Sequence, residues 1–426
     1  MKRVVILCVW LFSVVAGHAQ LSLDECRRLA RENYPEIRQY DLVHQTEQYN
    51  LSNAARAWIP QLAFSAQATW QTDAPNFPKE LTGMLAQQGL EIPGLRKDQY
   101  KVALELNQTI WDGGKSVADK RIARAEAAEQ KTMTDVDLYE LEGRVDDLYF
   151  GILLLDERIA QTNLTLNLLR SNLEKVRALQ RNGVAMQSDA DVLEAELLSV
   201  GQQLIQFESS CDSYRRMLGI FIGQKVGDRK LLRPSAVQPL SGESARPELA
   251  MFAAKIDRLM AQEKMVKSSS MPRLGFFAQG YYGYPGLDYM QSMMNSDWSW
   301  NAMLGVKLSW NFGAYYTQKN NLNKLRTSRQ QVEVQRDVFL FNMNLQAAQE
   351  NGDIARLRKA IADDDRIVAL RRSVREAAES KLRNGIIDTH DLLSKITDES
   401  TASMAPSMRE IELLKAIYEY KHTINR

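Results

Sequence analysis

Few residues in this chain have the types and spacing that catalysis or metal binding requires. Beyond the N-terminal segment, the histidines are His44, His390 and His422, and each is isolated in the sequence. They have neither the spacing of metal ligands nor a nucleophile in a recognisable catalytic order. The Asp-Gly-Gly turn at residues 112–114 is not followed by the Gly-Lys-Ser of a phosphate-binding loop. The sequence therefore predicts no enzyme, no cofactor and no metal centre.

A group of methionines is the remaining candidate for chemistry. Met290, Met293 and Met294 carry thioethers, which are soft metal ligands. They could handle a soft metal, but an exposed loop that happens to contain methionine is the simpler interpretation. Lys and Arg number 54 against 53 Asp and Glu, so the charge balance does not point to nucleic acid or an anionic surface as partner.

The most informative stretch is WSWNAMLGVKLSW, residues 298–310. Trp298, Trp300 and Trp310 share one face of an extended strand with small aliphatic residues, while polar residues occupy the other face. About 9 to 11 residues suffice for a tilted strand to cross a membrane, and tryptophans at both ends are typical of an aromatic belt. A soluble β-sandwich strand is the alternative for this stretch alone. Similar alternation occurs at about 61–70, 100–111 and 273–282, where Trp70 and Tyr100 extend the expected belt.

One order of elements occurs twice along the chain. Tyr34-Pro35-Glu36-Ile37 recurs as Arg246-Pro247-Glu248-Leu249, and Arg181-Asn182-Gly183 recurs as Arg383-Asn384-Gly385. An internal repeat of this kind decides the fold class. The first repeat spans 20–245: a helix at about 22–57, two strands joined by a loop at about 71–97, a long helical hairpin at about 115–218, and an irregular equatorial segment at 219–245. The second spans 246–426: a helix, two strands at about 273–282 and 298–310, and a hairpin at about 314–423.

The N-terminus is typical of an exported protein. Lys2 and Arg3 precede an apolar run that ends in small residues, which predicts a signal peptide over 1–19 with cleavage before Gln20. No later stretch reaches the about 20 apolar residues of a spanning helix, so membrane entry requires a β-barrel. Cys26 and Cys211 remain after cleavage, and whether they form a disulfide is left open.

Four strands are too few to close a barrel in a membrane. Single-chain bacterial barrels begin at about eight strands, and an open sheet in lipid leaves its edges unpaired. The chain must therefore oligomerise, and three copies, giving about twelve strands, begin to leave a lumen. The predicted fold class is a mixed α+β membrane protein.

The opening LSLDECRRLARENYPEIR, the Trp-Asp-Gly-Gly strand exit, the two long hairpins and the duplicated Arg-Asn-Gly turns resemble the TolC-like outer membrane efflux protein family. The resemblance implies a homotrimer in which four strands per chain complete a 12-stranded barrel in outer-membrane lipid, continuing into a periplasmic α-helical barrel. It also implies a periplasmic adaptor protein and an inner-membrane transporter of RND, ABC or MFS type. The function implied is an exit duct for efflux or type I secretion, with the transported substrate unspecified.

The same resemblance assigns roles to the two hairpin turns. The family's latch holds the first-repeat Asp with an Arg and a Tyr, but this chain has Ile387 and Leu382 there, so closure would need other contacts, for example from Lys381, Arg383 or His390. Asp189 and Asp391 also fit as ordinary helix-start carboxylates. The implied adaptor-docking residues are Gly183, Val184, Ala185, Gly385, Ile386 and Ile387, and the implied lumen constriction is Asp189, Asp391 and His390.

A soluble periplasmic coiled-coil scaffold is the competing function, because long amphipathic helices alone would permit it. The four alternating strands with aromatic ends argue for the membrane duct instead.

Overall fold

The computed structural model describes residues 20–89, 92–183, 185–235, 244–384 and 386–425. The predicted signal peptide at 1–19 lies outside the described residues. The chain divides into two compact units. The helical unit comprises Met1–Gln39, Thr132–Ala250 and Arg336–Arg426, and the sheet unit comprises Tyr40–Lys131 and Met251–Gln335.

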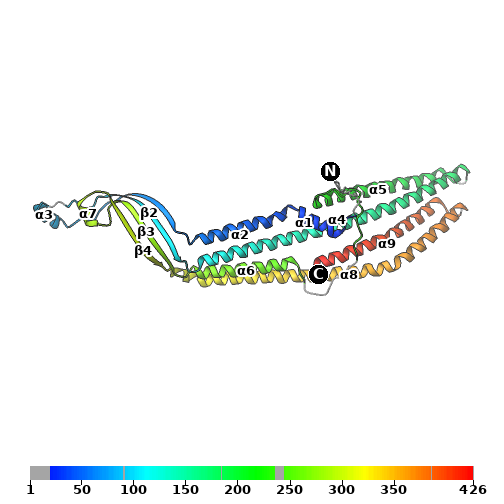
Figure 1. The fold of residues 1–426 in the computed structure, drawn as a ribbon. Helices are drawn as coiled ribbons and strands as arrows, with labels where there is room; N and C mark the ends of the chain where they lie inside the picture. Colours follow the sequence, from blue (N-terminus) through cyan, green and yellow to red (C-terminus); the bar gives the residue numbers. More distant parts are fainter. Residues whose placement is uncertain (1–19, 90–91, 184, 236–243, 385, 426) are drawn as a thin grey trace, which may run out of the picture. The chain divides into compact units, whose positions relative to one another are not determined.

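The sheet unit contains one four-stranded antiparallel sheet in the order β1-β2-β3-β4. The strands are β1 (Gln61–Trp70), β2 (Asp98–Trp111), β3 (Arg273–Tyr284) and β4 (Ser299–Ser309) (Figure 1). All four were expected from period-two alternation, and these strands together with the long helices confirm the predicted fold class of the chain.

The segments between paired strands are not simple loops. The predicted loop at 71–97 contains α3 (Lys79–Gln87), where Leu81, Met84 and Leu85 have helical spacing. The segment after β3 contains the short helix α7 (Tyr289–Met294). Asp288 caps α7 by accepting a hydrogen bond from the Gln291 N–H at 3.0 Å.

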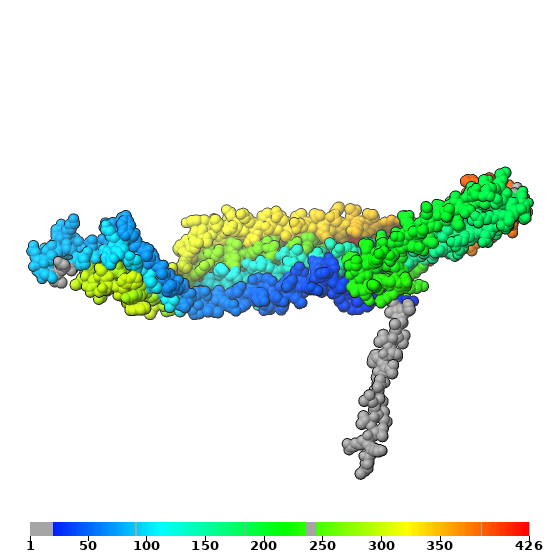
Figure 2. Space-filling model, turned by 90° about the horizontal axis from the view of Figure 1, so that it is seen from above, coloured from blue at the N-terminus to red at the C-terminus, as the bar shows by residue number. Residues whose placement is uncertain are grey.

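Four helical segments accompany the strands in the sheet unit. They are most of α2 (Gln39–Arg56), the first part of α4 (Lys115–Arg181), most of α6 (Pro247–Ser268) and the first part of α8 (Gly313–Arg383), and Figure 2 shows them side by side. Ion pairs link neighbours: Lys131 to Glu47 between α4 and α2 at 3.5 Å, Arg258 to Glu129 between α6 and α4, and Arg329 to Glu263 between α8 and α6 at 3.8 Å.

The helix predicted at about 22–57 is interrupted, so that prediction is wrong in its middle. The chain forms α1 (Leu23–Asn33), a 3₁₀ turn η1 (Pro35–Arg38) and then α2. Pro35 lacks an N–H, and Tyr34 before it is extended, with φ −67° and ψ 127°. Ser22 caps α1 by accepting from the Glu25 N–H at 3.3 Å, and the Glu25 carboxylate pairs with Arg28 at 2.7 Å.

The core of the helical unit lies on one stripe of α4. Leu138, Leu141, Val145, Tyr149 and Ile152 recur three or four positions apart and are all fully buried. The Tyr149 hydroxyl lies 2.8 Å from the Leu21 carbonyl and 2.6 Å from the Leu232 carbonyl. The Tyr149 hydroxyl thereby links the segment before α1, at Leu21, and the equatorial segment, at Leu232, to α4. The unit is completed by α1, η1, α5 (Gln187–Ile222) and α9 (Thr389–Ile424).

A buried ion pair reinforces this core. Arg27 of α1 donates from Nε to Oδ1 of Asp146 on α4 at 2.7 Å, and a second bond joins Nη2 to Oδ2. Burial raises the pKa of Asp146, even though the Arg27 charge and hydrogen bonds act to lower it. Cys26, beside Arg27, is buried and free, as is Cys211 on α5, so the disulfide that the sequence left open is not formed.

His422, near the end of α9, predicts a pH dependence of stability. Its ring stacks on Tyr139 at 4.2 Å, and burial lowers its pKa to about 4, with Arg246 and Arg27 acting in the same direction and Glu248 and Asp147 opposing. An unfolded histidine titrates near 6.5. The unfolded state therefore gains a proton between about pH 6.5 and 4 that the folded state resists, so we expect on the order of 2 kcal/mol to be lost over that window.

Thermal unfolding of the detergent-solubilised protein between pH 7.5 and 4.5 measures this loss. His422→Phe keeps an aromatic ring against Tyr139, and we expect it to reduce the loss of thermal stability at acid pH. His44→Asn, at a side chain that is 61% exposed, is the matched control and should not. Equal slopes in wild type and His422→Phe would exclude His422 as the cause.

Candidate functional site

The register of the sheet separates an apolar face from a polar one. Leu62 lies opposite Leu106, Phe64 opposite Leu104, and Ala278 opposite Leu304. These residues and Val306 share one face, as the alternation predicts. Leu62, Phe64 and Leu304 are 65%, 73% and 75% exposed in the single chain. A contiguous apolar surface of this kind marks contact with lipid or protein.

The opposite face of the sheet is polar and internally hydrogen-bonded. Lys101 Nζ donates to Gln279 Oε1 at 2.9 Å, and the Gln279 amide donates to Glu105. Lys101 also lies 4.5 Å from the centre of the Tyr281 ring. Lys307 is on the same face, because it lies opposite Gly275 in the β3–β4 ladder. The sheet therefore has one face suited to lipid and one suited to water.

Aromatic side chains gather at both ends of the strands. At the loop end, Trp298 stacks on Tyr100 at 5.7 Å and contacts Tyr282 at 5.4 Å, and Tyr282 also contacts Trp300 at 5.0 Å. Trp70 ends β1 on the same side, opposite Asp98. All residues of the predicted belt thus lie at strand ends. Tyr282 contacts two of these residues but was not named in the prediction, although its place in the period-two pattern could have indicated it.

The helix end of the sheet carries the second aromatic group. Trp310 contacts Phe312 at 4.8 Å, and its Nε1 donates to the Ser270 carbonyl at 3.0 Å. Trp111, the last residue of β2, is exposed at the same end. Phe312 and Trp111 were not among the predicted belt residues. Phe312 lies just beyond the alternating stretch at 298–310 and Trp111 is the last residue of the stretch at about 100–111, and these positions were the available signal.

The first hairpin turn connects α4 to α5. Gly183 has φ +71°, a left-handed conformation that favours glycine, and its N–H donates to the Gln180 carbonyl at 2.9 Å. Asp189 caps α5, because its Oδ2 accepts from the Met186 N–H at 2.8 Å. Its helix-start role is therefore present. Ala185 packs against the hydrophobic cluster between the hairpins, and Val184 lies outside the described residues.

The second hairpin turn connects α8 to α9. Asp388, which sequence reasoning missed, is the N-cap of α9 and accepts from the Asp391 N–H at 2.8 Å. An Asp directly before Thr389 is a typical cap signal. Asp391, His390 and Ile386 are exposed, and Gly385 lies outside the described residues. The described residues thus place the carboxylates and His390 at the tips without joining them in one site.

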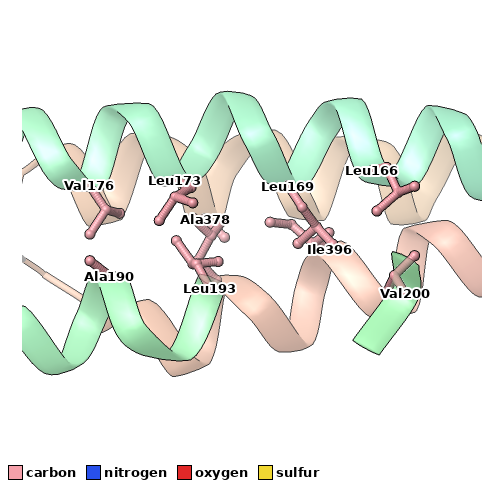
Figure 3. Packing of buried hydrophobic residues seen from close by; sticks show 10 residues of the cluster. Leu166, Leu169, Leu173, Val176, Ala190, Leu193, Val200, Ala378 and Ile396 are labelled. Atoms are coloured by element: carbon pink, nitrogen blue, oxygen red, sulfur yellow. The ribbon is translucent and has the colours of Figure 1, made fainter. Parts of the chain in front are cut away.

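An apolar cluster joins the two hairpins just behind the turns. Figure 3 shows Leu173 and Val176 of α4 facing Leu193 and Ala190 of α5, with Leu169 next to Ile396 of α9. The whole buried cluster is Leu166, Leu169, Leu173, Val176, Ala190, Leu193, Val200, Ala378, Leu392 and Ile396. Its members come from all four hairpin helices, so each hairpin completes the core of the other.

Leu382 and Ile387, at the positions where the resemblance implies a Tyr and an Arg, are partly buried against this cluster. Their apolar side chains therefore add to the hydrophobic contact between the hairpins. The side chains of Lys381, Arg383 and His390, the expected alternatives for closure, are exposed and have no ion-pair partner in the part of the chain that the structure describes. Their role in closure stays a prediction.

Polar contacts accompany the cluster at both of its ends. Lys175 of α4 lies 3.4 Å from Glu379 of α8, and Thr165 of α4 shares a 2.6 Å hydrogen bond with Ser400 of α9. Burial is the largest single effect on Glu379 and opposes its ionisation, but the hydrogen bonds and charges of Arg375 and Lys175 together outweigh burial and lower the pKa of Glu379. Each hairpin is thus fixed to the other by both apolar and charged contacts.

Residues 27–223 match the family model described as outer membrane efflux protein. The outer-membrane channel OprN has the same fold, with 14% identity over 94% of this chain and 89% of that one, at a TM-score of 0.71. VceC of Vibrio cholerae matches with 15% identity over 94% of this chain and 95% of that one, at a TM-score of 0.67. CmeC of Campylobacter jejuni matches with 13% identity over 94% of this chain and 85% of that one, also at a TM-score of 0.67. No curated protein matches this chain in sequence.

The fold is therefore that of the outer-membrane channels. The resemblance to the TolC-like outer membrane efflux protein family, predicted from the duplicated motifs, is confirmed. No helix among the described residues is both long and apolar enough to cross a membrane.

The cluster between the hairpins predicts which tip substitutions matter. Leu193 is completely buried, so Leu193→Ala should cost about 2 to 5 kcal/mol in local opening. Its neighbour Val192 is 39% exposed, and Val192→Ala should cost less than about 1 kcal/mol. Amide hydrogen exchange over residues 166–200 measures the difference. Equal exchange in the two variants would show that the cluster does not hold the hairpins together.

Proposed function

We propose that this chain is the outer-membrane exit duct of a tripartite efflux or type I secretion system. The observation that carries the proposal is an open four-stranded sheet with one apolar face, one polar face and aromatic side chains at both strand ends. This pattern is what a segment of a transmembrane barrel requires. Three copies would supply twelve strands around a lumen.

The strand order supports a homotrimer. β1 and β4 are the outer strands of the sheet, so each has one edge that pairs with no other strand among the described residues. In lipid, each unpaired backbone group costs several kcal/mol. Pairing β4 of one copy with β1 of the next removes every edge when the ring closes. The apolar face then meets outer-membrane lipid and the polar face meets the water-filled lumen.

Partners follow from the family resemblance. A periplasmic adaptor would contact the hairpin turns around Gly183 and Ile386, and an inner-membrane transporter of RND, ABC or MFS type would supply the energy. The duct itself would conduct passively, after removal of the signal peptide. The exposed Ile386 and Met186 side chains, 67% and 74% accessible, offer apolar contact at both turns.

A substitution on the apolar face tests the membrane assignment. Leu304→Arg should lower the inserted, trimeric fraction, because Arg in the middle of a lipid-facing surface costs about 2 to 4 kcal/mol. Met303→Arg, the adjacent residue on the polar face, is the matched control and should insert normally. Outer-membrane fractionation followed by native electrophoresis measures both. Recovery of wild-type chain in the aqueous extract without detergent would instead favour the periplasmic scaffold.

The carboxylates at the turns test the constriction. Replacing Asp189 and Asp391 together by Asn keeps an oxygen for the Asp189 cap but removes six charges per trimer, and we expect the cation-to-anion permeability ratio to fall by about twofold or more. Reversal potentials in a salt gradient across a planar bilayer measure this ratio. Asp212→Asn, on the exposed face of α5, is the control that should change nothing. An unchanged ratio in the double variant would place these residues away from the constriction.

A further inference from the structure

Two cationic side chains sit next to each other at the helix end of the polar sheet face. Arg273 of β3 lies opposite Ser309 of β4, and Lys307 of β4 lies opposite Gly275 of β3. Arg273 and Lys307 are therefore diagonal neighbours on one face, a relation that brings residues to about 7 to 8 Å. Gly275 presents no side chain between them.

Neither cation has a charged partner in the part of the chain that the structure describes. Among the residues that the structure describes, no carboxylate lies within ion-pair distance of Arg273 or Lys307, and no hydrogen bond involves either side chain. The strands carry two other charged residues on this face, Lys101 and Glu105. Both are linked through Gln279, and their opposite charges offset each other. The excess positive charge of the face is thus concentrated at its helix end.

Both cations line a cavity of about 380 Å³, together with Asn107, Phe277 and the start of α4. The cavity also contains two carboxylates, but both are engaged. Asp112 accepts from the Gly114 N–H at 2.9 Å and the Ser116 N–H at 2.6 Å, where it satisfies the start of α4. Asp119 pairs with Lys115 at 2.8 Å. Neither is free to neutralise Arg273 and Lys307.

We propose that this cavity binds phosphate-bearing anions through Arg273 and Lys307. A guanidinium matches two phosphate oxygens at once, and an ammonium adds a point charge beside it. The cavity volume exceeds the about 30 Å³ that one water occupies in the liquid, so it accommodates a phosphate with bound water. The inference rests on the proposed function, under which this face lines the lumen and three such sites surround it.

The ligand chemistry has two sources. One is a phosphate-bearing solute that passes through the duct, and the other is the headgroup of a phospholipid bound at the rim of the sheet. The first would interfere with ion flow, whereas the second would copurify with the protein. The two arms of the experiment separate these sources.

The first arm measures block of single-channel conductance by inorganic tripolyphosphate, added on the loop side of a planar bilayer. For Arg273→Gln combined with Lys307→Gln, the concentration that halves conductance should rise by about tenfold or more, because the attraction acts within a Debye length of the charges. Glu105→Gln removes a negative charge from the same face and should lower that concentration or leave it unchanged. Both results support the solute-binding site.

The second arm counts phospholipid phosphorus per protomer in detergent-purified wild type and double variant. A fall in phosphorus with unchanged block assigns the site to a lipid headgroup. Unchanged block together with unchanged phosphorus overturns the proposal. A wild-type protein that forms no channels contradicts the proposed duct, and the phosphorus arm still tests the anion site in that case.

Discussion

The fold of this chain depends on one constraint: a β-sheet edge must find a hydrogen-bonding partner. Among the described residues the sheet has four strands, and Leu62, Phe64 and Leu304 on its apolar face are 65%, 73% and 75% exposed. An edge strand on an apolar sheet invites pairing with another chain. Further copies of the chain would pair the sheet edges, and lipid would cover the apolar face. The single chain provides neither the edge partners nor the cover.

The helical unit is stabilised by contacts within the single chain. Along α4, buried residues first pack against α1 and the equatorial segment near Tyr149, and then against the opposite hairpin near Leu169. A helix of 67 residues cannot be stabilised by propensity alone, so most of its stability must come from such contacts. The Arg27–Asp146 pair and the Tyr149 hydroxyl fix one region, and the cluster around Leu193 fixes the other.

Much of this arrangement could be predicted from the sequence, because strand alternation and helical spacing are local signals. The bounds of β1, the faces of Leu104 and Leu304, and the ends of α4 and α9 all followed from them. The break at Pro35 was missed because the apolar spacing continues across it. α3 was missed because a short helix flanked by Pro and Gly looks like a loop.

The candidate site was less predictable, because it depends on contacts between distant residues. Asp189 and Asp391 were recognised as helix-start carboxylates, but Asp388, which is the N-cap of α9, was missed although its place directly before Thr389 is a cap signal. The absence of the expected Arg and Tyr was visible in the sequence. The sequence did not show that Leu382 and Ile387 pack against a cluster whose members lie as far as about 200 positions away. No local pattern indicates which side chains meet there.

The apolar side chains at those two positions change how the joint between the hairpins responds to its surroundings. An ionic joint weakens as salt screens its charges. A joint formed by Leu382 and Ile387 depends on water exclusion, which is little affected by salt at physiological strength and grows weaker on cooling. The apolar part of the joint between the hairpin ends should therefore hold across changes in salt concentration and weaken on cooling, whereas the Lys175–Glu379 ion pair behind it remains sensitive to salt.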